Sequence, residues 1–97
     1  MNTWDKRLAI GKTDNYSVTV DNLWLSGDTI TSAVVTSTSD PDDVIIGVET
    51  ILTGSQISVP ITGVTSGYHP VHFEYTTQAG RSDCVEVFVY VAGTCGN

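Results

Sequence analysis

Basic side chains are scarce in this chain. Its 97 residues hold four lysines and arginines against eleven aspartates and glutamates, for a formal net charge of −7. After Lys12, the only lysine or arginine is Arg81. A phosphate backbone would meet net repulsion and no basic groove, so we expect no nucleic acid among the partners. The carboxylates predict a well-solvated surface, with a partner that has a basic face as the alternative.

Cysteine and histidine are also scarce, which limits metal and redox chemistry. The only cysteines are Cys84, in the predicted last strand, and Cys95, in a glycine-flanked tail. Their pairing is possible but not demanded, and we interpret both as thiols of a protein made in a reducing cytoplasm. The only histidines, His69 and His72, lie three residues apart in a predicted strand and therefore project to opposite faces. One metal ion cannot bind both, so we expect no metal and no cofactor.

No combination of residues predicts an enzyme. No serine lies in a nucleophile-elbow context, and the predicted position of Cys84 opposite a carboxylate disfavours a reactive thiolate. Glu74 and Glu86 would share an open sheet face, where nothing desolvates a carboxyl group as a glycosidase acid requires. The acidic loop at residues 40–43 lacks the alternating ligands and central glycine of a calcium loop, so we interpret it as a solvated turn. The prediction is a protein without catalytic activity.

Long apolar runs are absent as well. No run approaches the roughly 20 residues that cross a bilayer. The first residues also lack the basic and apolar pattern of a secretory leader. We therefore expect neither a membrane anchor nor a secretory signal.

What the chain does contain is an excess of strand-forming residues. Threonine, serine, valine and isoleucine dominate, and no window shows a sustained helical period. Six or seven short apolar segments are separated by Gly, Asp, Ser and Pro turn signals, which is typical of a sandwich of two sheets. The length suits one domain. The sequence therefore predicts an all-β fold, an Ig-like β-sandwich of about seven antiparallel strands.

The segment from Tyr68 to Val91 predicts one long antiparallel hairpin. We place its loop at residues 78–80, with Gly80 as the residue with positive φ in a three-residue turn. The pairs would then be Phe73 with Val85, Val71 with Val87, His69 with Val89, Glu74 with Cys84, and His72 with Glu86. A two-residue loop would instead place Phe73 opposite Glu86 and mix the faces, at a cost of roughly 1.5 to 3 kcal/mol for each large apolar side chain.

Two earlier segments supply further core residues. Residues 15–21 alternate, with Tyr16, Val18 and Val20 on one face, and predict a half-buried strand. A bend follows, in which Trp24 is expected to plug one end of the sandwich.

Three irregularities interrupt the pattern. Between residues 29 and 37 the apolar side chains fall on both faces, so either both faces are buried or the strand has a bulge. The strand over residues 44–52 is interrupted at Gly47. Pro60 cannot donate to a ladder, so its strand is an edge strand or has its nitrogen directed to solvent.

The first residues differ from everything that follows. Residues 1–12 hold three of the four basic residues, together with Trp4. Two interpretations stay open: an ordered first strand or frayed terminus, with Trp4 covering an open end of the core, or an arm that docks on another subunit. For the domain boundaries we take residues 1–11 as an N-terminal arm and residues 12–97 as a single Ig-like β-sandwich domain.

The order of motifs over residues 12–91 resembles the phage fiber-tail adaptor family, small Ig-like phage virion structural proteins. The motifs that carry the resemblance are Lys12-Thr-Asp-Asn-Tyr16, Trp24-Leu25, Gly27-Asp28-Thr29-Ile30, a Gly-bounded crossover to Tyr68, and Thr76-Thr77-Gln-Ala-Gly80-Arg81-Ser-Asp83. The chain departs from the family pattern in residues 1–11 and in its longer middle around residues 44–52.

The resemblance implies a virion component that works by contact rather than by chemistry. It would join tail, neck or fiber subunits, with multiple copies in a ring, and it would carry no catalytic residues. The implied location is the phage tail or neck, after synthesis in the host cytoplasm. An open sandwich also has edge strands that can add a strand from a neighbour.

We hypothesise that residues 1–11 reach a neighbouring subunit. Trp4 would be the anchor, and Lys6 and Arg7 would meet an acidic surface. Deletion of the segment should then abolish incorporation without lowering the melting temperature, whereas loss of the fold would make the segment a core strand.

The alternative function is an Ig-like glycan-binding or adhesion module, which needs exposed aromatic side chains on one sheet face. Phe88 and Tyr90 are the candidates, because they lie on the face opposite Val85 and Val87. The competing interpretation is that a neighbouring subunit or the arm covers them, as protein-interface residues.

Overall fold

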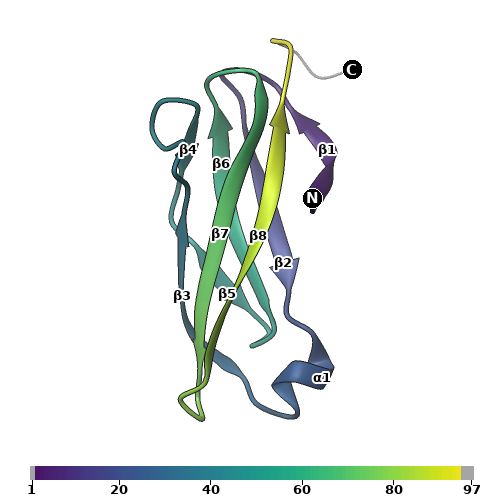
Figure 1. Ribbon diagram of the computed structural model, residues 1–97, viewed down its shortest axis with the longest axis vertical. Helices are drawn as coiled ribbons and strands as arrows, with labels where there is room; N and C mark the ends of the chain where they lie inside the picture. The colour runs from purple at the N-terminus through teal and green to yellow at the C-terminus, as the bar shows by residue number, and fades with distance from the viewer. Residues whose placement is uncertain (1, 95–97) are drawn as a thin grey trace.

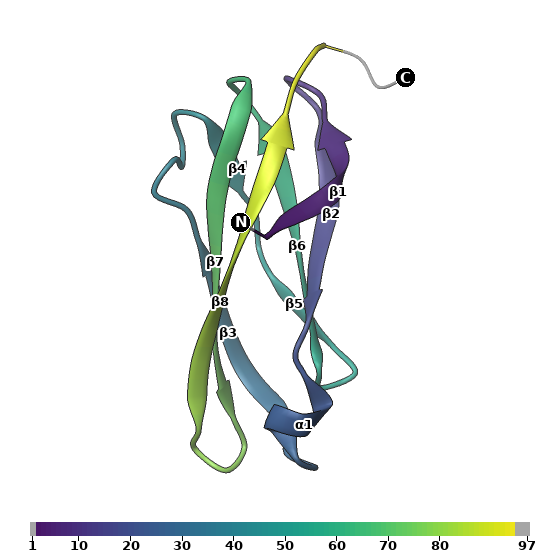
Figure 2. The same cartoon turned by 45° about the vertical axis from the view of Figure 1, so that its right-hand side comes forward.

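The computed structural model describes residues 2–94 and contains two sheets packed face to face (Figures 1 and 2). The first sheet has the strand order β1-β8-β7-β3, and the second has the order β2-β6-β4, with β5 also paired to β6. The strands are β1 (Thr3–Leu8), β2 (Thr13–Thr19), β3 (Ile30–Thr36), β4 (Val44–Ile46), β5 (Thr50–Leu52), β6 (Gln56–Gly63), β7 (Gly67–Thr77) and β8 (Ser82–Val91), and one short helix, α1 (Asn22–Leu25), follows β2. The fold class is therefore the predicted β-sandwich.

The core lies between the inner faces of the two sheets. Alternation along each strand directs one set of side chains inward, and eight of these are fully buried. They are Val44, Ile57, Val59, Ile61, Val71, Phe73, Val89 and Val91. The described residues contain no helix long and apolar enough to span a membrane.

The predicted hairpin register is confirmed. Phe73 pairs with Val85, His72 with Glu86, and Glu74 with Cys84. The N–H of Thr77 donates to the carbonyl of Arg81 across the three-residue loop, and Gly80 has φ of 84°. The three-residue loop thus places apolar residues beside one another on the inner face of the sheet, as expected from the period-two pattern.

The strand count and orientation differ from the prediction of about seven antiparallel strands. Residues 2–94 form eight strands, and β1 runs parallel to β8. Residues 22–25 form a helical turn rather than a bend, because the carboxylate of Asp21 accepts from the N–H of Leu23 and caps it. Trp24 in this turn packs edge-on against Tyr75 at the lower end of the sandwich, as predicted.

Of the two alternatives for the strand that holds Pro60, the edge strand was wrong. β6 is the central strand of its sheet, and Pro60 pairs with Asn15 of β2 on one side. On the other side its carbonyl accepts from the N–H of Gly47, in the break between β4 and β5. Pro60 and Gly47 therefore form one feature, because the partner strand is interrupted where the proline has no N–H to offer. A Cβ on Gly47 would lie 2.5 Å from Cγ of Pro60, which favours glycine there.

Of the two alternatives for β3, the structure contains the bulge. The register shifts between Ile30 and Ser32, after which Val34 points outward and is 55% exposed, while Val35 is buried. The extra residue changes the parity of the strand, so apolar residues on both parities do not require both faces to be buried.

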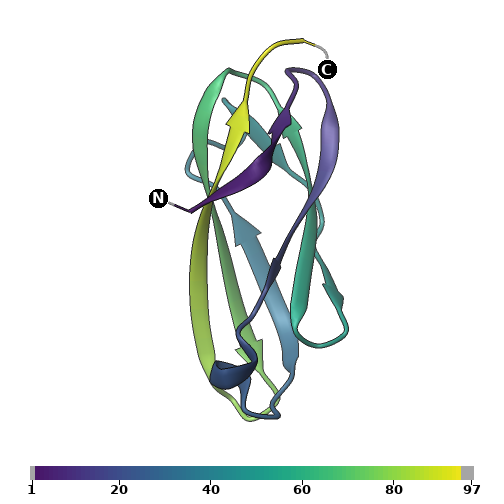
Figure 3. The ribbon, with the colours of Figure 1, turned by 90° about the vertical axis from the view of Figure 1, so that its right-hand side faces the viewer.

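Residues 3–8, which the sequence left open as strand or arm, form an ordered strand in the isolated chain. β1 pairs with Phe88, Tyr90 and Val91 of β8, and Leu8 is buried. Figure 3 shows β1 crossing the upper part of the seam between β8 and β2. The first strand thus belongs to the sandwich, and any docking on a neighbouring subunit stays a prediction.

Candidate functional site

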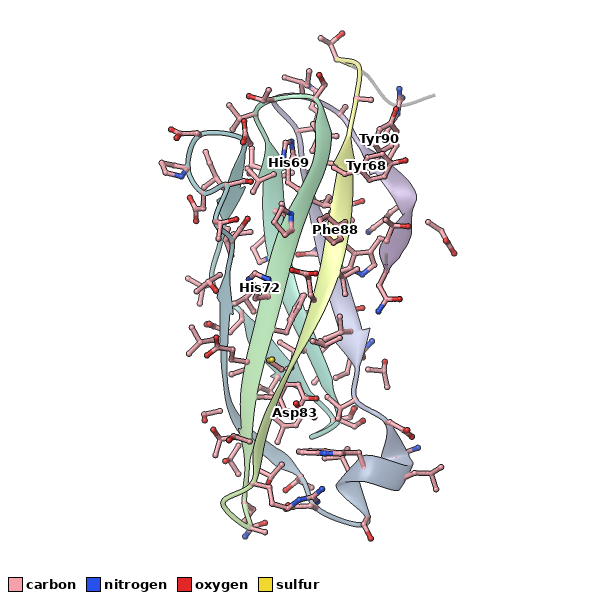
Figure 4. All side chains as sticks on the ribbon, in the orientation of Figure 1. Tyr68, His69, His72, Asp83, Phe88 and Tyr90 are labelled. Carbon is pink, nitrogen blue, oxygen red and sulfur yellow. The ribbon has the colours of Figure 1, made fainter. Side chains whose placement is uncertain are left out.

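The outer face of the first sheet carries exposed aromatic side chains at its upper end (Figure 4). Tyr68 of β7 and Tyr90 of β8 are partners in the ladder, and their rings stack with centroids 4.7 Å apart and planes 29° from parallel. Tyr68 is 53% exposed and Tyr90 36%. The next rung pairs Pro70 with the half-buried Phe88. We call Tyr68, Pro70, Phe88 and Tyr90 the tyrosine face.

Phe88 and Tyr90 thus lie on the outer side of β8, as the sequence predicted, while Val87 on the inner side is buried. Sequence reasoning missed Tyr68 as a surface residue. The signal was available, because the predicted register already places residue 68 opposite residue 90. Arg7 of β1 lies opposite Tyr90 in the parallel ladder and therefore flanks the tyrosine face.

Trp4 points the other way, into the seam between the sheets. Its ring lies 4.7 Å from that of Tyr16 and 5.9 Å, edge-on, from that of Phe73. Its Nε1 donates to the carbonyl of Ser17, 2.9 Å away, at the edge of β2. Trp4 therefore covers an open side of the core and satisfies an edge carbonyl.

Lys6 is also bound within the chain. Its Nζ lies 3.0 Å from the Asp14 carboxylate, donates to the carbonyl of Asn15, and sits 4.3 Å from the centre of the Tyr16 ring. Hydrogen bonding from Lys6 lowers the pKa of Asp14. A role for Trp4 or Lys6 at an interface would therefore require β1 to leave its own sheet.

The phenol of Tyr16 is sealed beneath β1. Its side chain is 1% exposed, and its hydroxyl has no hydrogen-bond partner among the described residues. Burial raises the pKa of Tyr16 to about 12, and the nearby charge of Asp14 adds to the shift. The group has the character of a core aromatic rather than of an acid or base in a site.

At the lower end, two of the motifs that carry the family resemblance, residues 27–30 and residues 76–83, meet in space. Oδ1 of Asp28 accepts from the N–H groups of Thr29 and Ala79, at 2.9 and 3.3 Å. A hydrogen bond from the Thr77 side chain is the largest of the effects that lower the pKa of Asp28. This carboxylate thus fastens the β7–β8 loop to the start of β3, a role that sequence reasoning missed.

Arg81 completes this contact from the hairpin side. Its guanidinium stacks over the Trp24 ring at 4.0 Å and donates to the carbonyls of Trp24 and Leu25 at 2.6 and 3.2 Å. It also approaches Asp28 at 3.8 Å. Since all of these partners lie in the same chain, the two motifs hold the end of the sandwich together, a structural role.

The two histidines lie on opposite sides of β7, as predicted. His72 Nε2 is 2.6 Å from the Glu86 carboxylate on the outer face. His69 is buried, with Nε2 2.8 Å from the carbonyl of Thr65 and Nδ1 3.9 Å from the Asp43 carboxylate. Within residues 2–94, no group of three or more potential ligand side chains is placed to hold a metal ion.

Cys84 is an exposed free thiol on the outer face, opposite Glu74. The other cysteine, Cys95, lies outside the described residues, so the prediction that both are thiols stays untested for that residue. The arrangement that stands out across the described surface is therefore one of contacts, the tyrosine face, rather than of reacting groups.

The model of a protein family described as "Podophage GP4 fiber-tail adaptor protein gp77" matches residues 9–90. No curated protein matches the chain. The matched range spans both motifs of the lower end, strands β2 to β7 and all of β8 but its last residue, and it leaves out β1.

Solved structures with similar folds are Ig-like and surface-layer domains. Domains 4 and 5 of the S-layer protein SbsC match with a TM-score of 0.64 and 19% identity, covering 90% of this chain and 40% of that one. The PKD domain from the KIAA 1837 protein matches with a TM-score of 0.54 and 19% identity, covering 96% of this chain and 84% of that one. The chain thus spans less than half of the SbsC fragment, and at this identity both likenesses concern the fold alone.

Proposed function

Because the chain belongs to the podophage GP4 fiber-tail adaptor family, we propose that it is a non-enzymatic subunit of a phage virion that joins tail, neck or fiber components by protein-protein contact. The family supports a structural adaptor role. The position in the particle, the ring of copies and the identities of the neighbours are part of the proposal.

The observation that best supports a contact surface is the stacked pair of Tyr68 and Tyr90. Aromatic side chains are enriched where protein interfaces bury their central residues, because they add large contact area at small entropic cost. Here two rings are held against each other by the ladder, so their geometry is set before any partner arrives. We assign the tyrosine face to the contact with a neighbouring virion subunit.

The N-terminal strand is a second part of this proposal. Within this strand the interface residues expected from the sequence were Trp4, Lys6 and Arg7, and all three have interactions within the chain. They would reach a neighbour through exchange of β1 between adjacent subunits, in which each copy keeps the same contacts but receives them from the next. Arg7 is the ladder partner of Tyr90, so exchange of β1 would also change which subunit flanks the tyrosine face.

Virus particles separated from soluble protein on a density gradient test the proposed function. The chain's peptides should co-migrate with the major capsid protein at a fixed small copy number. Its absence from particles would refute the adaptor role.

A double substitution, Tyr68→Ser with Tyr90→Ser, then tests the tyrosine face in a phage complemented with the variant chain. We expect the copy number per particle to fall at least tenfold while the purified variant keeps its melting temperature. The matched control is Leu23→Ser, which removes an 88% exposed apolar side chain at the other end of the molecule and should leave incorporation unchanged. Equal incorporation of both variants would place the contact elsewhere.

The second candidate function is a glycan-binding module, and the same tyrosine pair is the observation that favours it. Sugar rings stack on exposed aromatic faces, and two adjacent rings could form a platform. However, each ring already covers one face of the other, which halves the surface available for stacking. Shifts of the Tyr68 and Tyr90 ring signals on titration with host-surface glycans would favour this function, and unmoved signals would exclude it.

A further inference from the structure

The edge of β8 that faces away from β7 has an upper half and a lower half, which differ. In the upper half, β1 pairs with residues 88–91, and the N–H of Phe88 donates to the carbonyl of Asn2 at 2.7 Å. In the lower half, residues 82–87 pair with β7 on one side, and no described strand pairs with them on the other. The position that β1 occupies beside the upper half of β8 therefore holds no described strand beside residues 82–87.

The backbone groups that face this empty side can be identified from the register. In an antiparallel ladder, every second residue bonds to the partner strand. The carbonyl of Arg81 accepts from the N–H of Thr77 in β7. Counting every second residue from Arg81, the backbone groups of Asp83, Val85 and Val87 also face β7. The N–H and C=O groups of Ser82, Cys84 and Glu86 face away from β7, as does the N–H of Phe88, which donates to the carbonyl of Asn2.

A groove runs beside this edge, between the two sheets. It is lined by residues 18–21, at and just after the end of β2, by residues 83–85 of β8, and by Trp24 and Tyr75. Val18, Val85 and Trp24 pack against the core but stay partly exposed. Figure 3 shows this stretch of the seam lying between β1 above and α1 beneath. A strand laid on β8 here would have an apolar surface on its inner side.

The rim of the groove is acidic. Asp21 and Asp83 both line it, and the whole chain carries a net charge of −7. The Asp83 carboxylate also takes up one backbone donor of this edge, because its Oδ1 accepts from the N–H of Cys84 at 2.8 Å. Arg81, near the lower end, is engaged by the carbonyls of Trp24 and Leu25. An incoming basic side chain would therefore find carboxylates at the rim.

From these observations we infer that residues 82–87 of β8 receive an extended segment of another virion protein, which adds a strand to the first sheet in line with β1. The segment has about six residues, with apolar side chains at alternate positions directed into the groove and lysine or arginine at its ends, facing Asp21 and Asp83. Backbone hydrogen bonds to Ser82 and Glu86 supply affinity, and the groove supplies specificity. This inference rests on the proposed adaptor function and names its second contact.

Proline at position 86 tests the backbone part of the inference. Glu86→Pro removes an N–H that faces the empty edge and takes nothing from the β7 ladder, and proline is tolerated at such edges. Glu86→Val is the matched control, because it loses the same side chain and keeps the N–H. In a complemented phage, we expect Glu86→Pro to be depleted from particles at least tenfold and Glu86→Val to be incorporated like the wild type.

Charge reversal at Asp83 tests the partner's chemistry and does not depend on a proline folding well. Asp83 is exposed, so both Asp83→Lys and Asp83→Asn should keep the melting temperature within a few degrees of the wild type. We expect Asp83→Lys to reduce incorporation at least tenfold and Asp83→Asn to reduce it less. Equal effects of the two substitutions would overturn the basic character of the segment.

The outcomes separate this inference from the function on which it rests. If the wild-type chain is incorporated and Glu86→Pro and Asp83→Lys are incorporated equally well, the added strand is refuted and the adaptor function stands. If the wild-type chain is absent from particles, the adaptor function itself fails. If the tyrosine-face variant is incorporated while both β8 variants are lost, the groove is the principal contact.

Discussion

The upper and lower halves of the seam between β2 and β8 are built from the same two strands, but they differ in what covers the strand edges. In the upper half, Trp4 lies over the aromatic core and donates to the edge of β2, while β1 pairs with the edge of β8. In the lower half, both strand edges border a groove with an acidic rim, and no described strand fills it.

The difference shows how a sandwich can protect one edge and leave another available. An unpaired strand edge is a site for strand addition, and proteins usually cover or charge it. The upper half uses a strand of its own chain. The lower half uses Asp83, whose carboxylate bonds to the N–H of the next residue. A single carboxylate on one N–H group is easier for a partner strand to displace than a whole strand that is paired with the edge.

The largest expected effect comes from opening the closed half. Trp4→Ala removes the ring that packs on Tyr16 and Phe73 and leaves the carbonyl of Ser17 without its donor. Truncation of a packed tryptophan costs about 3 kcal/mol of unfolding free energy. Denaturant unfolding should show this loss. Trp24→Ala, in the open half, should cost less, because among the described aromatic rings only that of Tyr75 packs on it and the guanidinium of Arg81 lies over its face.

An unchanged melting temperature in Trp4→Ala would contradict the comparison. It would mean that β1 is weakly held and that residues 1–11 act as the docking arm that the sequence also allowed.

The next effect is a loss of stability in alkali caused by Tyr16. Its phenol has a pKa of about 12 in the folded chain, against 10.0 for an ordinary tyrosine. The neutral form is favoured by folding, so the contribution is fully present below pH 10 and is lost as the pH rises toward 12. The shift corresponds to about 2 to 3 kcal/mol.

Tyr16→Phe isolates this effect, because it keeps the ring and removes the titrating group. Urea unfolding at pH 8 and pH 11 should show a smaller alkaline loss in the variant. At pH 8 the variant should be as stable as the wild type or slightly more so, since the hydroxyl it loses is buried without a described partner. Tyr75→Phe is the comparison from the open half: burial also raises the pKa of that phenol, but this variant keeps Tyr16 and should therefore keep the alkaline loss that Tyr16 causes. An alkaline loss that persists in Tyr16→Phe would assign the effect to another group.

A smaller effect is expected at Lys6. Lys6→Met keeps an unbranched apolar side chain and removes the Nζ that lies over the Tyr16 ring and pairs with Asp14. Both side chains of this ion pair are about half exposed. Such exposed pairs contribute at most about 1 kcal/mol. Because Lys6 lowers the pKa of Asp14, the wild type gains this stability above the unfolded carboxyl pKa near 4 and loses it as the pH falls below that. The variant should therefore show a flatter decline in acid, measured by thermal melts between pH 7 and pH 2, and an equal decline would refute the pairing.

The smallest effect belongs to Cys84 in the open half. Cys84→Ser replaces an exposed thiol and should change the unfolding free energy by less than about 0.5 kcal/mol. In the free protein the thiol should react with an alkylating reagent at the rate of an unfolded peptide. A slowly reacting thiol would contradict the exposure of Cys84 on the outer face.

Much of the fold was predictable because it depends on neighbours in sequence. The β7–β8 register follows from a short loop and a period-two pattern, and Phe73 meets Val85 as that pattern requires. The outward direction of Phe88 and Tyr90 follows from the same register. Asp28 could not be assigned, because its partners at Thr77 and Ala79 lie about fifty residues away and no local pattern marks them.

The sequence by itself determined the class of the fold, the last hairpin and the inner face of each strand, since alternation, turn residues and apolar burial act over a few residues. Only the tertiary structure decided that β1 runs parallel to β8, that β6 is central despite Pro60, and that the seam is closed above and open below. These features depend on which strands meet across the sandwich. The free energy of such a meeting comes from residues far apart in the chain, such as Trp4 with Phe73, and no local pattern encodes it.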